Sequence, residues 1–541
     1  MKITNKLLRM STIALVALFA VSCADLAVEN TNEPATEQVI VTASDVAGLV
    51  QGAYATWALY SQAYQTAPLL VQADWYTGTV GNWWVNLAGN EVGDLDAIQN
   101  GTRKRTEAFP NTPTTSYGPV VNFHWTYYYS ALYNVNTALA IIKAGEINLG
   151  TEAEVQQLKA TAKLLQGILH GSVGLIFDQG YIVDENTDVS TLALSPYKDV
   201  VAAGITYLEE AITTATAAAA AGSPGVSTSI IPEIGSVDSR FAGAGTIDWV
   251  EFKEIANTYA ASFSAQYART ATESNDIDWT KVYNYASKGL SFDFAPHSDD
   301  NNWIPYLYYY GNNDWWRPDM RIVNKLDPNQ PKYWPTTDGQ NGQGPDAPSV
   351  NSPDQRFGPG KDYEESYAWS VFNPTRGYFK KTHVVYSRYN YFVGGIVWSD
   401  PIPYMLRAQN NLLIAEAELN RTGGSLANAV AMINDTRVGR GGLAALTILD
   451  SPAKIREALE YEWDIEVAVT GVSNLSPWYN SRRWGNMLSG SMLHLPVPAG
   501  ELGLSGIDYY TFGGGGEGSA PKIIGGSGID TKNRNAININ R

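Results

Sequence analysis

The segment LRAQNNLLIAEAEL, residues 406–419, begins the part of the chain that decides the fold. It is followed by SLANAVAMINDTRVGRGGL (425–443) and IREALEYEWDIEVAVTG (455–471). In these segments the apolar residues recur at a regular helical spacing. We therefore predict helices over 403–421, 425–437 and 451–470.

The N-terminal part of the chain carries further helical patterns. In one of them, Val155, Leu158 and Leu165 fall on a single face. The pair Ser195-Pro196 has the composition of a helix start, a capping residue followed by a first-turn proline. We predict helices over 44–64, 117–144, 151–177, 195–222, 249–272 and 279–290.

The expected architecture is a set of antiparallel helix pairs interrupted by one loop-rich insert, residues 291–400. The insert lacks long periodicity and is rich in Asn, Asp, Pro, Gly and aromatic residues. A loop region of this length usually has a function. Stacked helix pairs suggest a tetratricopeptide-like solenoid, although no consensus repeat is legible. We expect one domain over 43–541, with an N-terminal helical half at 43–222, the insert, and a C-terminal region at 403–502.

The leader MKITNKLLRMSTIALVALFAVSC ends at Cys23, the only cysteine of the chain. Its positively charged start and short apolar run are typical of a signal peptide over 1–22, and the run is too short to span a bilayer. The small residues before Cys23 resemble the lipobox of bacterial lipoproteins, in which the cysteine is acylated. Residues 23–42 would then be a lipidated tether. The alternative is an ordinary signal peptide with an incidental cysteine.

The composition restricts the class of partner. The formal charge of −17 becomes −20 once the leader, with three positive charges and no acid, is removed. Such a balance argues against nucleic acid and against an electrostatic membrane surface site. No other stretch of the sequence is long and apolar enough to span a membrane. Without paired cysteines, disulfides contribute nothing to stability.

The C-terminal segments resemble the motifs of SusD/RagB-like proteins. Residues 406–419 resemble the "AE-x-LL-x-x-AEA" helix, 425–443 the "A-x-x-x-IN-x-VR-x-RAG-L" helix, and 455–471 "I-x-x-ER-x-x-EL-x-x-EG". SRRWG (481–485) resembles "DL-x-RWG", and HLPVPAGEL (494–502) resembles "L-P-IP-x-x-EL". The early helix of the family is matched by Trp125, Tyr129 and Asn136.

The chain also departs from the pattern of the family. Gln409 stands where Glu is frequent, and Trp463 replaces the Arg of the "ER" pair. The Asp that usually precedes the position of Arg482 is missing. These departures indicate a divergent branch of the family.

The resemblance implies a surface lipoprotein of the outer membrane, anchored by its N-terminal lipid and facing the cell exterior. Such proteins capture a nutrient, most often an oligosaccharide and sometimes a peptide. They deliver it to a TonB-dependent SusC-like transporter, without catalytic activity and without a cofactor. The implied fold is mainly α-helical, with tetratricopeptide-like helix pairs, a large loop-rich insert and a few short strands.

The candidate ligand-binding residues are aromatic. Flat rings match the C–H faces of sugars, and neighbouring polar groups can satisfy hydroxyls. We favour Trp315, Trp316 and Arg317, because an Asn-Asn-Asp turn precedes them. The other candidates are Trp303, Tyr308, Tyr310, Trp75, Trp83 and Trp84.

Two alternatives concern what these rings do. Most of them could instead belong to the core or contact a transporter, since cores and interfaces use the same residue types. The ligand is also open, because a body of charge −20 favours neutral sugars or cationic peptides over polyanions. A surface assembly role is a further hypothesis, which a large exposed apolar patch would support.

Glu462 and Glu466 are the candidate pair of carboxylates. They are four residues apart and share a helix face with Ile455 and Leu459. A surface glycoside hydrolase would use such a pair in a cleft. Because this face points to the core, we expect structural ion pairs instead. The candidate partners are Arg437, Arg440, Arg482 and Arg483.

Metal sites are not expected from the sequence. The five histidines are scattered, without the spacing of a zinc motif. Asp184-x-Asn186-x-Asp188 begins like a calcium loop, but Val189 occupies the position that needs glycine.

Overall fold

The computed structural model describes most of the chain beyond the tether. Cys23 and the tether up to residue 39 lie outside the described residues. The mainly α-helical fold expected from the sequence is confirmed. The described residues are 40, 42–78, 88–89, 91–92, 104–105, 108–116, 118–233, 245–298, 316–333, 348–367, 381–389, 401–514 and 522–525.

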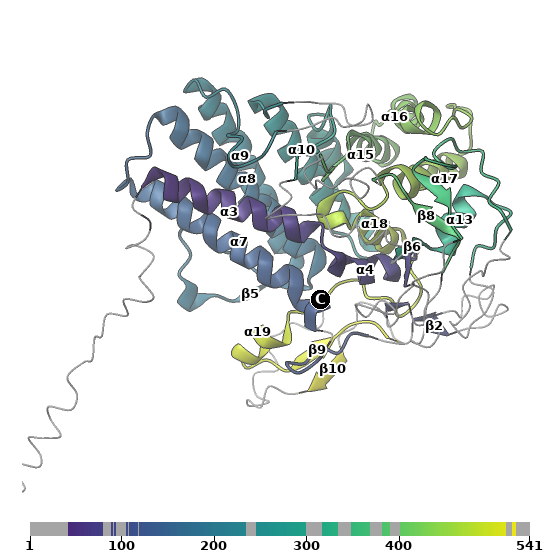
Figure 1. Ribbon diagram of the computed structural model, residues 1–541, viewed down its shortest axis with the longest axis horizontal. Coiled ribbons are helices and arrows are strands. Elements are labelled where there is room, and N and C mark those ends of the chain that lie inside the picture. The colour runs from purple at the N-terminus through teal and green to yellow at the C-terminus, as the bar shows by residue number, and fades with distance from the viewer. Residues whose placement is uncertain are drawn as a thin grey trace, which may run out of the picture.

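The N-terminal half is a stack of long helices (Figure 1). These are α3 (Ala43–Ser61), α7 (Gly118–Ala144), α8 (Glu152–Ile176) and α9 (Tyr197–Ala220), and α10 (Trp249–Gln266) follows directly after this half. Each was expected, although α10 ends earlier than predicted. Capping boxes begin three of them, at Thr42, Thr151 and Asp248, where side chain and main chain bond reciprocally.

The packing of α8 against α9 is very close because glycines line the contact. A Cβ atom on Gly204 would lie 2.5 Å from the main-chain nitrogen of Gly171 and 2.9 Å from the oxygen of Gly167. Only a residue without a side chain allows two main chains to approach so closely. The two helices therefore form one rigid pair.

The predicted start of α9 is wrong in its detail. Ser195 does not cap the helix, because residues Leu194–Pro196 form strand β5, which pairs with β4 (Gln179–Tyr181). The residue at the cap position is Pro196, which makes no side-chain capping bond. The strand pairing holds Ser195 in an extended conformation. Ser195 therefore lies one residue before Pro196, which occupies the N-cap position of α9.

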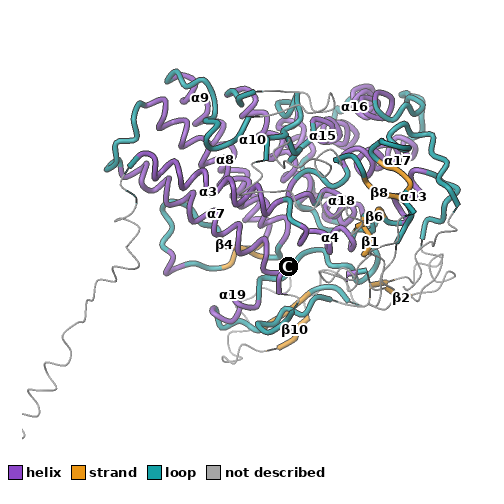
Figure 2. The backbone as a smooth tube through the Cα atoms, in the orientation of Figure 1, coloured by secondary structure: helices purple, strands orange, loops and turns teal. Residues whose placement is uncertain are grey.

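The C-terminal half contains shorter helices (Figure 2). The predicted helix over 451–470 is interrupted: α17 ends at Glu462 and continues as one π-helical turn, Trp463–Val467, called the π-turn below. The chain then turns sharply at Ala468, whose φ of 48° is unusual for a residue with a side chain. The helices of this half are α11 (Trp279–Ala286), α13 (Met320–Leu326), α15 (Arg407–Asn420), α16 (Leu426–Gly439), α17 (Pro452–Glu462), α18 (Ser476–Trp484) and α19 (Ala499–Leu504).

Short elements complete the described fold, and all paired strands are antiparallel. The two-stranded pairs besides β4–β5 are β1 (Tyr76–Gly78) with β6 (Trp316–Pro318), β2 (Glu91–Val92) with β3 (Lys104–Arg105), β7 (Tyr363–Glu365) with β8 (Val384–Tyr386), and β9 (Tyr509–Thr511) with β10 (Lys522–Gly525). The short helices are α4 (Ala67–Gln72) and the 3₁₀ turns Tyr64–Thr66, Val189–Thr191, Glu273–Asp276 and Val472–Asn474.

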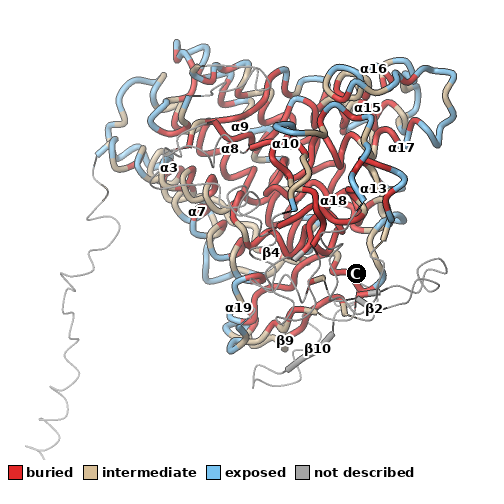
Figure 3. Tube along the Cα trace, turned by 45° about the vertical axis from the view of Figure 1, so that its right-hand side comes forward, coloured by how far each residue is buried: buried red, intermediate tan, exposed pale blue. Residues whose placement is uncertain are grey.

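The hydrophobic core runs through the centre of the molecule and joins both halves (Figure 3). Trp57 of α3, for example, stacks on Tyr404 at a ring-centroid distance of 4.9 Å. A second, smaller cluster lies among α11, α15, α16 and α17. Within the described residues, no helix combines the length and the apolarity that a membrane span requires.

Candidate functional site

Two of the predicted ligand-binding stretches are attached to the fold at one place. Strand β1 ends at Gly78, which is paired with Trp316, the first residue of β6. In the sequence, Trp83 and Trp84 follow Gly78, and Trp315 directly precedes Trp316. The two stretches, separated by more than two hundred positions in the chain, therefore begin from neighbouring points on the described structure.

A third part of the chain joins this place. The guanidinium of Arg317 donates to the main-chain oxygen of Ser366 at 3.0 Å. The hydroxyl of Thr382 donates to the main-chain oxygen of Pro318 at 2.7 Å. Ser366 and Thr382 lie on either side of residues 368–380, which are outside the described part. Strands β1, β6, β7 and β8 thus lie together at one place, and they are called the base below.

Three of the predicted ligand-binding residues belong to this base and are buried. The exposed fraction is 0% for Trp75, 1% for Trp316 and 0% for Arg317. Trp75 packs edge-on against Tyr76 and Tyr386 at centroid distances of 4.6 and 5.4 Å. These side chains have the interior role that the sequence left as the alternative, and none of the three is available as an exposed ligand surface.

The other candidate ligand-binding residues fall outside the described part of the chain. Their role therefore stays a prediction. They are Trp83, Trp84, Trp303, Tyr308, Tyr310 and Trp315.

The π-turn is joined to the base and its neighbouring residues by hydrogen bonds. The main-chain oxygens at the end of a helix lack partners inside the helix. In the π-turn, three of them accept hydrogen bonds from side chains of other segments. The oxygen of Asp464 accepts from the indole N–H of Trp75 at 3.0 Å, and that of Ile465 from the hydroxyl of Tyr363 at 3.0 Å. The oxygen of Glu466 accepts from the guanidinium of Arg388.

The carboxylates at the π-turn are paired with arginines. Arg356 lies 2.7 Å from Glu462 and 3.0 Å from Glu466 through its Nη1 atom. Glu466 also binds Arg388 at 3.0 Å and is in contact with Arg440. Burial by itself would raise the pKa of Glu466, but the three guanidinium groups hold it far below its ordinary value. For Glu462 burial prevails over Arg356, and its pKa is raised.

Asp464 makes the corresponding contacts on the other side of the turn. Its Oδ2 atom lies 2.6 Å from Arg321 and 2.7 Å from Lys325, both on α13. Burial opposes its ionisation, but the two cations lower its pKa to about 2. The π-turn is therefore bound to the insert through Asp464 and Glu466, and Glu462, the last residue of α17, adds a further pair with Arg356.

The prediction of buried, paired glutamates is confirmed, but most of the predicted partners are wrong. Arg440 does bind Glu466. Arg437 donates instead to the main-chain oxygen of Ala444. The sequence offered no signal for Arg356 and Arg388, the main partners, because they lie in the insert, where no periodicity marks a buried face.

The two remaining arginines of the prediction bind elsewhere. Arg483 forms a bidentate ion pair with Glu416, in which Nη1 lies 2.6 Å from Oε1 and Nη2 lies 2.6 Å from Oε2. Arg482 donates to the main-chain oxygens of Leu175, Leu493 and Gln266. Its guanidinium therefore satisfies the ends of α8 and α10, where helix dipoles favour a cation.

The arrangement of these groups bears on catalysis. Glu462 and Glu466 are buried and bound by arginine, so they do not form an acid–base pair in a cleft.

In the segment that begins like a calcium loop, Asp184 and Asp188 accept hydrogen bonds from the main-chain nitrogens of Asn186 and Ser190 in their own turns. Among the described residues, no three or more His, Cys, Asp or Glu side chains are grouped so as to hold a metal ion.

Comparisons with known proteins bear on the fold. No family model matches the sequence, and no curated protein matches it. Solved structures do match. A SusD superfamily protein from Parabacteroides distasonis aligns with a TM-score of 0.54 and 12% identity, over 85% of this chain and 96% of that one.

Two further matching structures are of proteins named as carbohydrate-binding or glycan-binding. Surface glycan-binding protein A from Bacteroides uniformis aligns with a TM-score of 0.49 and 16% identity, over 85% of this chain and 97% of that one. A SusD-like carbohydrate binding protein from Bacteroides vulgatus aligns with a TM-score of 0.46 and 14% identity, over 83% and 85%. At such identities a match establishes the fold only. The match to the Parabacteroides distasonis structure agrees with the order of helices and short strands described above. This chain therefore has the SusD-like fold.

Proposed function

We propose that this chain is a lipid-anchored binding protein of the cell surface. It captures a nutrient, preferably an oligosaccharide, and delivers it to a TonB-dependent SusC-like transporter of the outer membrane. The observation that carries the proposal is the pairing of Gly78 with Trp316. That pairing attaches two aromatic-rich stretches to one base within a SusD-like fold.

The ligand surface in this proposal consists of rings from both stretches. Trp83 and Trp84 come from the stretch after β1, and Trp315 from the stretch before β6. The base is stabilised by buried bonds to the π-turn, including that of Trp75. A rigid base favours binding because less conformational freedom is lost when the ligand arrives. The other proposed contacts are Trp303, Tyr308 and Tyr310.

The proposed location follows from the leader. Acylation of Cys23 would tether the folded body to the outer membrane through the residues before α3. The strongly acidic body favours neutral or cationic ligands at low salt. A neutral oligosaccharide satisfies this condition and fits aromatic faces, which is why it is preferred over a peptide.

The test is binding of residues 24–541 to arrays of neutral and acidic polysaccharides and of peptides. Trp83→Ala and Trp315→Ala are compared with Tyr133→Ala, a matched control because Tyr133 is 61% exposed on α7. We expect one polysaccharide to be retained, with affinity reduced about tenfold or more in the two tryptophan variants and unchanged in the control. No reducing ends should be released.

Other results would favour other functions. Binding to peptides alone would identify a peptide-binding protein with the same fold. Binding only to a transporter barrel, with no small ligand, would favour a surface assembly role and assign the rings to contacts between proteins. Release of reducing ends would favour a glycoside hydrolase, which would then need carboxylates other than Glu462 and Glu466.

A further inference from the structure

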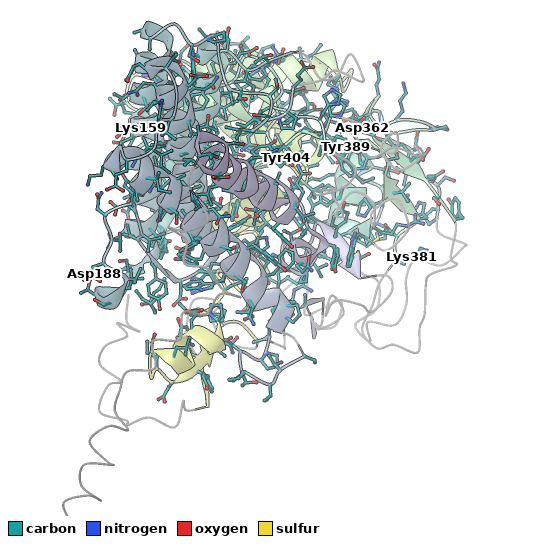
Figure 4. The ribbon with its side chains drawn as sticks, turned by 60° about the vertical axis from the view of Figure 1, so that its left-hand side comes forward. Lys159, Asp188, Asp362, Lys381, Tyr389 and Tyr404 are labelled. Atoms are coloured by element: carbon teal, nitrogen blue, oxygen red, sulfur yellow. The ribbon has the colours of Figure 1, made fainter. Side chains whose placement is uncertain are left out.

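A surface cavity of about 410 Å³, wide open to solvent, lies between α8 and α9 in the N-terminal half. One wall comes from α8 and carries Lys159 and Lys163, and the other comes from α9 and carries Glu209 and Glu210. Figure 4 shows Lys159 well separated in the view from Asp362 of the insert. The cavity is therefore distinct from the base of the proposed capture site.

The wall from α9 presents hydrogen-bond acceptors. The hydroxyls of Thr206, Thr213 and Thr214 donate to main-chain oxygens four residues earlier, at 3.1, 3.0 and 2.8 Å. Because their protons are used in this way, only oxygen lone pairs remain for a ligand. The carboxylate of Glu209 accepts a hydrogen bond from the hydroxyl of Tyr285. Among the described residues it has no cation as partner. This wall is thus acidic and poor in donors.

Lys163 is part of the wall rather than a free charge. It is 5% exposed, and its ammonium lies 2.8 Å from Glu210 and 3.1 Å from Glu185. A further bond goes to Gln166 at 3.0 Å. The three protons of the ammonium are therefore used, and two carboxylates surround one cation. The net charge of Lys163, Glu185 and Glu210 together is therefore negative.

Lys159 differs from Lys163, although the two stand one turn apart on α8. In the part of the chain that the structure describes, the ammonium of Lys159 has no ion pair or hydrogen bond. The cavity thus has an uncompensated cation on one wall and uncompensated acceptors on the other. A ligand with a single charge would meet repulsion from one wall, whereas a ligand with both charges would be attracted by both.

We propose that this cavity binds a small zwitterion of the amino-acid type. The ligand ammonium lies against Glu209 and the threonine oxygens, and the ligand carboxylate lies against Lys159. The opposition of the two walls gives selectivity for the distance between the charges of the ligand. The site does not depend on the proposed capture function, because no residue of the insert lines it.

The experiment is calorimetric titration of the purified protein with ω-amino acids, from glycine to 6-aminohexanoate. Butylamine and butyrate serve as singly charged probes, and glucose as a neutral one. We expect one chain length to bind best, with a dissociation constant near the millimolar range, and the singly charged probes to bind at least about tenfold more weakly.

The variants locate the binding. Lys159→Met and Glu209→Gln should each weaken the best ligand about tenfold, whereas Lys159→Arg, which keeps the charge, should retain binding. Lys253→Met on α10 is the matched control, because Lys253 does not line the cavity. The proposal is overturned if no ω-amino acid binds, if butylamine, butyrate or glucose binds equally well, or if Lys159→Met and Glu209→Gln leave the affinity unchanged. Thermal unfolding of each variant checks that the fold is intact.

Discussion

The indole N–H of Trp75 donates a hydrogen bond of 3.0 Å to the main-chain oxygen of Asp464, 389 positions later in the chain. Trp75 directly precedes β1, and Asp464 belongs to the π-turn, so this bond joins the base to the C-terminal helices. Both groups are buried, which means that neither can exchange its partner for water. The stability of the base therefore depends on contacts made far away in sequence.

Trp75→Phe tests this bond directly. The ring is kept in part, but the oxygen of Asp464 loses its donor. A buried acceptor without a partner costs about 1–3 kcal/mol, so we expect a loss of unfolding free energy of at least that size. Urea unfolding followed by circular dichroism measures the loss. A change close to zero would show that water or another donor replaces the indole.

Glu466→Gln tests the ion pairs of the π-turn. The substitution removes the charge that compensates Arg356, Arg388 and Arg440. Breaking a buried ion pair by removing one partner costs about 3–5 kcal/mol, and we expect a loss in that range. Lys454→Gln is the control, because it removes an exposed pair with Asp450 and should cost far less than loss of the buried pairs. Similar losses in the two variants would contradict the importance of the buried cluster.

The pH dependence of stability should carry the signature of two buried acids. Burial raises the pKa of Asp178 to about 6, and that of Asp293 to about 6. Because these values lie above those of the unfolded chain, the folded state binds the extra proton more tightly. The stability contributed by each proton is fully present below about pH 4 and is lost as the pH rises to about 6.

Asp178→Asn isolates one of these contributions. Asn keeps an oxygen that can accept from Tyr510, but it does not ionise. Relative to the natural protein, the variant should gain stability between about pH 4 and pH 6, by about 3 kcal/mol at most, and the gain should be constant above that range. Denaturant unfolding at several pH values measures the difference. A difference that does not change with pH would show that Asp178 has an ordinary pKa.

Gly204→Ala tests the close contact of α8 and α9. The new Cβ atom would meet main-chain atoms of Gly171 and Gly167, which cannot move as a flexible side chain would. We expect destabilisation of about 1–3 kcal/mol. Gly48→Ala on α3 is the opposite case, because the added Cβ meets nothing within 4 Å, and it should stabilise by about 0.5–1 kcal/mol. The comparison fails if both variants shift the melting temperature in the same direction.

The sequence predicts the scaffold well because local signals determine it. The helix expected over 151–177 is found at Glu152–Ile176, since the capping box of Thr151 and Glu154 fixes its start. The helix over 451–470 ends early at the π-turn, whose formation depends on side chains from distant segments. Helical periodicity contains no information about such partners.

The candidate site was harder to predict for the same reason. Aromatic composition alone does not distinguish a buried ring from an exposed one, and Trp75 and Trp316 proved to be interior. Arg356 and Arg388 lie in a region without periodicity, so nothing marked them as buried partners of Glu466. The motifs of the C-terminal region nevertheless led to the correct fold, because they preserve the order of its helices.

The position of the π-turn late in the chain has a consequence for folding. A chain is synthesised from its N-terminus, so neighbouring helices such as α8 and α9 can pair as soon as both are present. The base must wait until residues 463–467 arrive, because Trp75, Tyr363 and Arg388 find these acceptors there. Contacts so distant in sequence form slowly. The base is therefore completed late in folding, and its unpaired strands are open to aggregation during this delay.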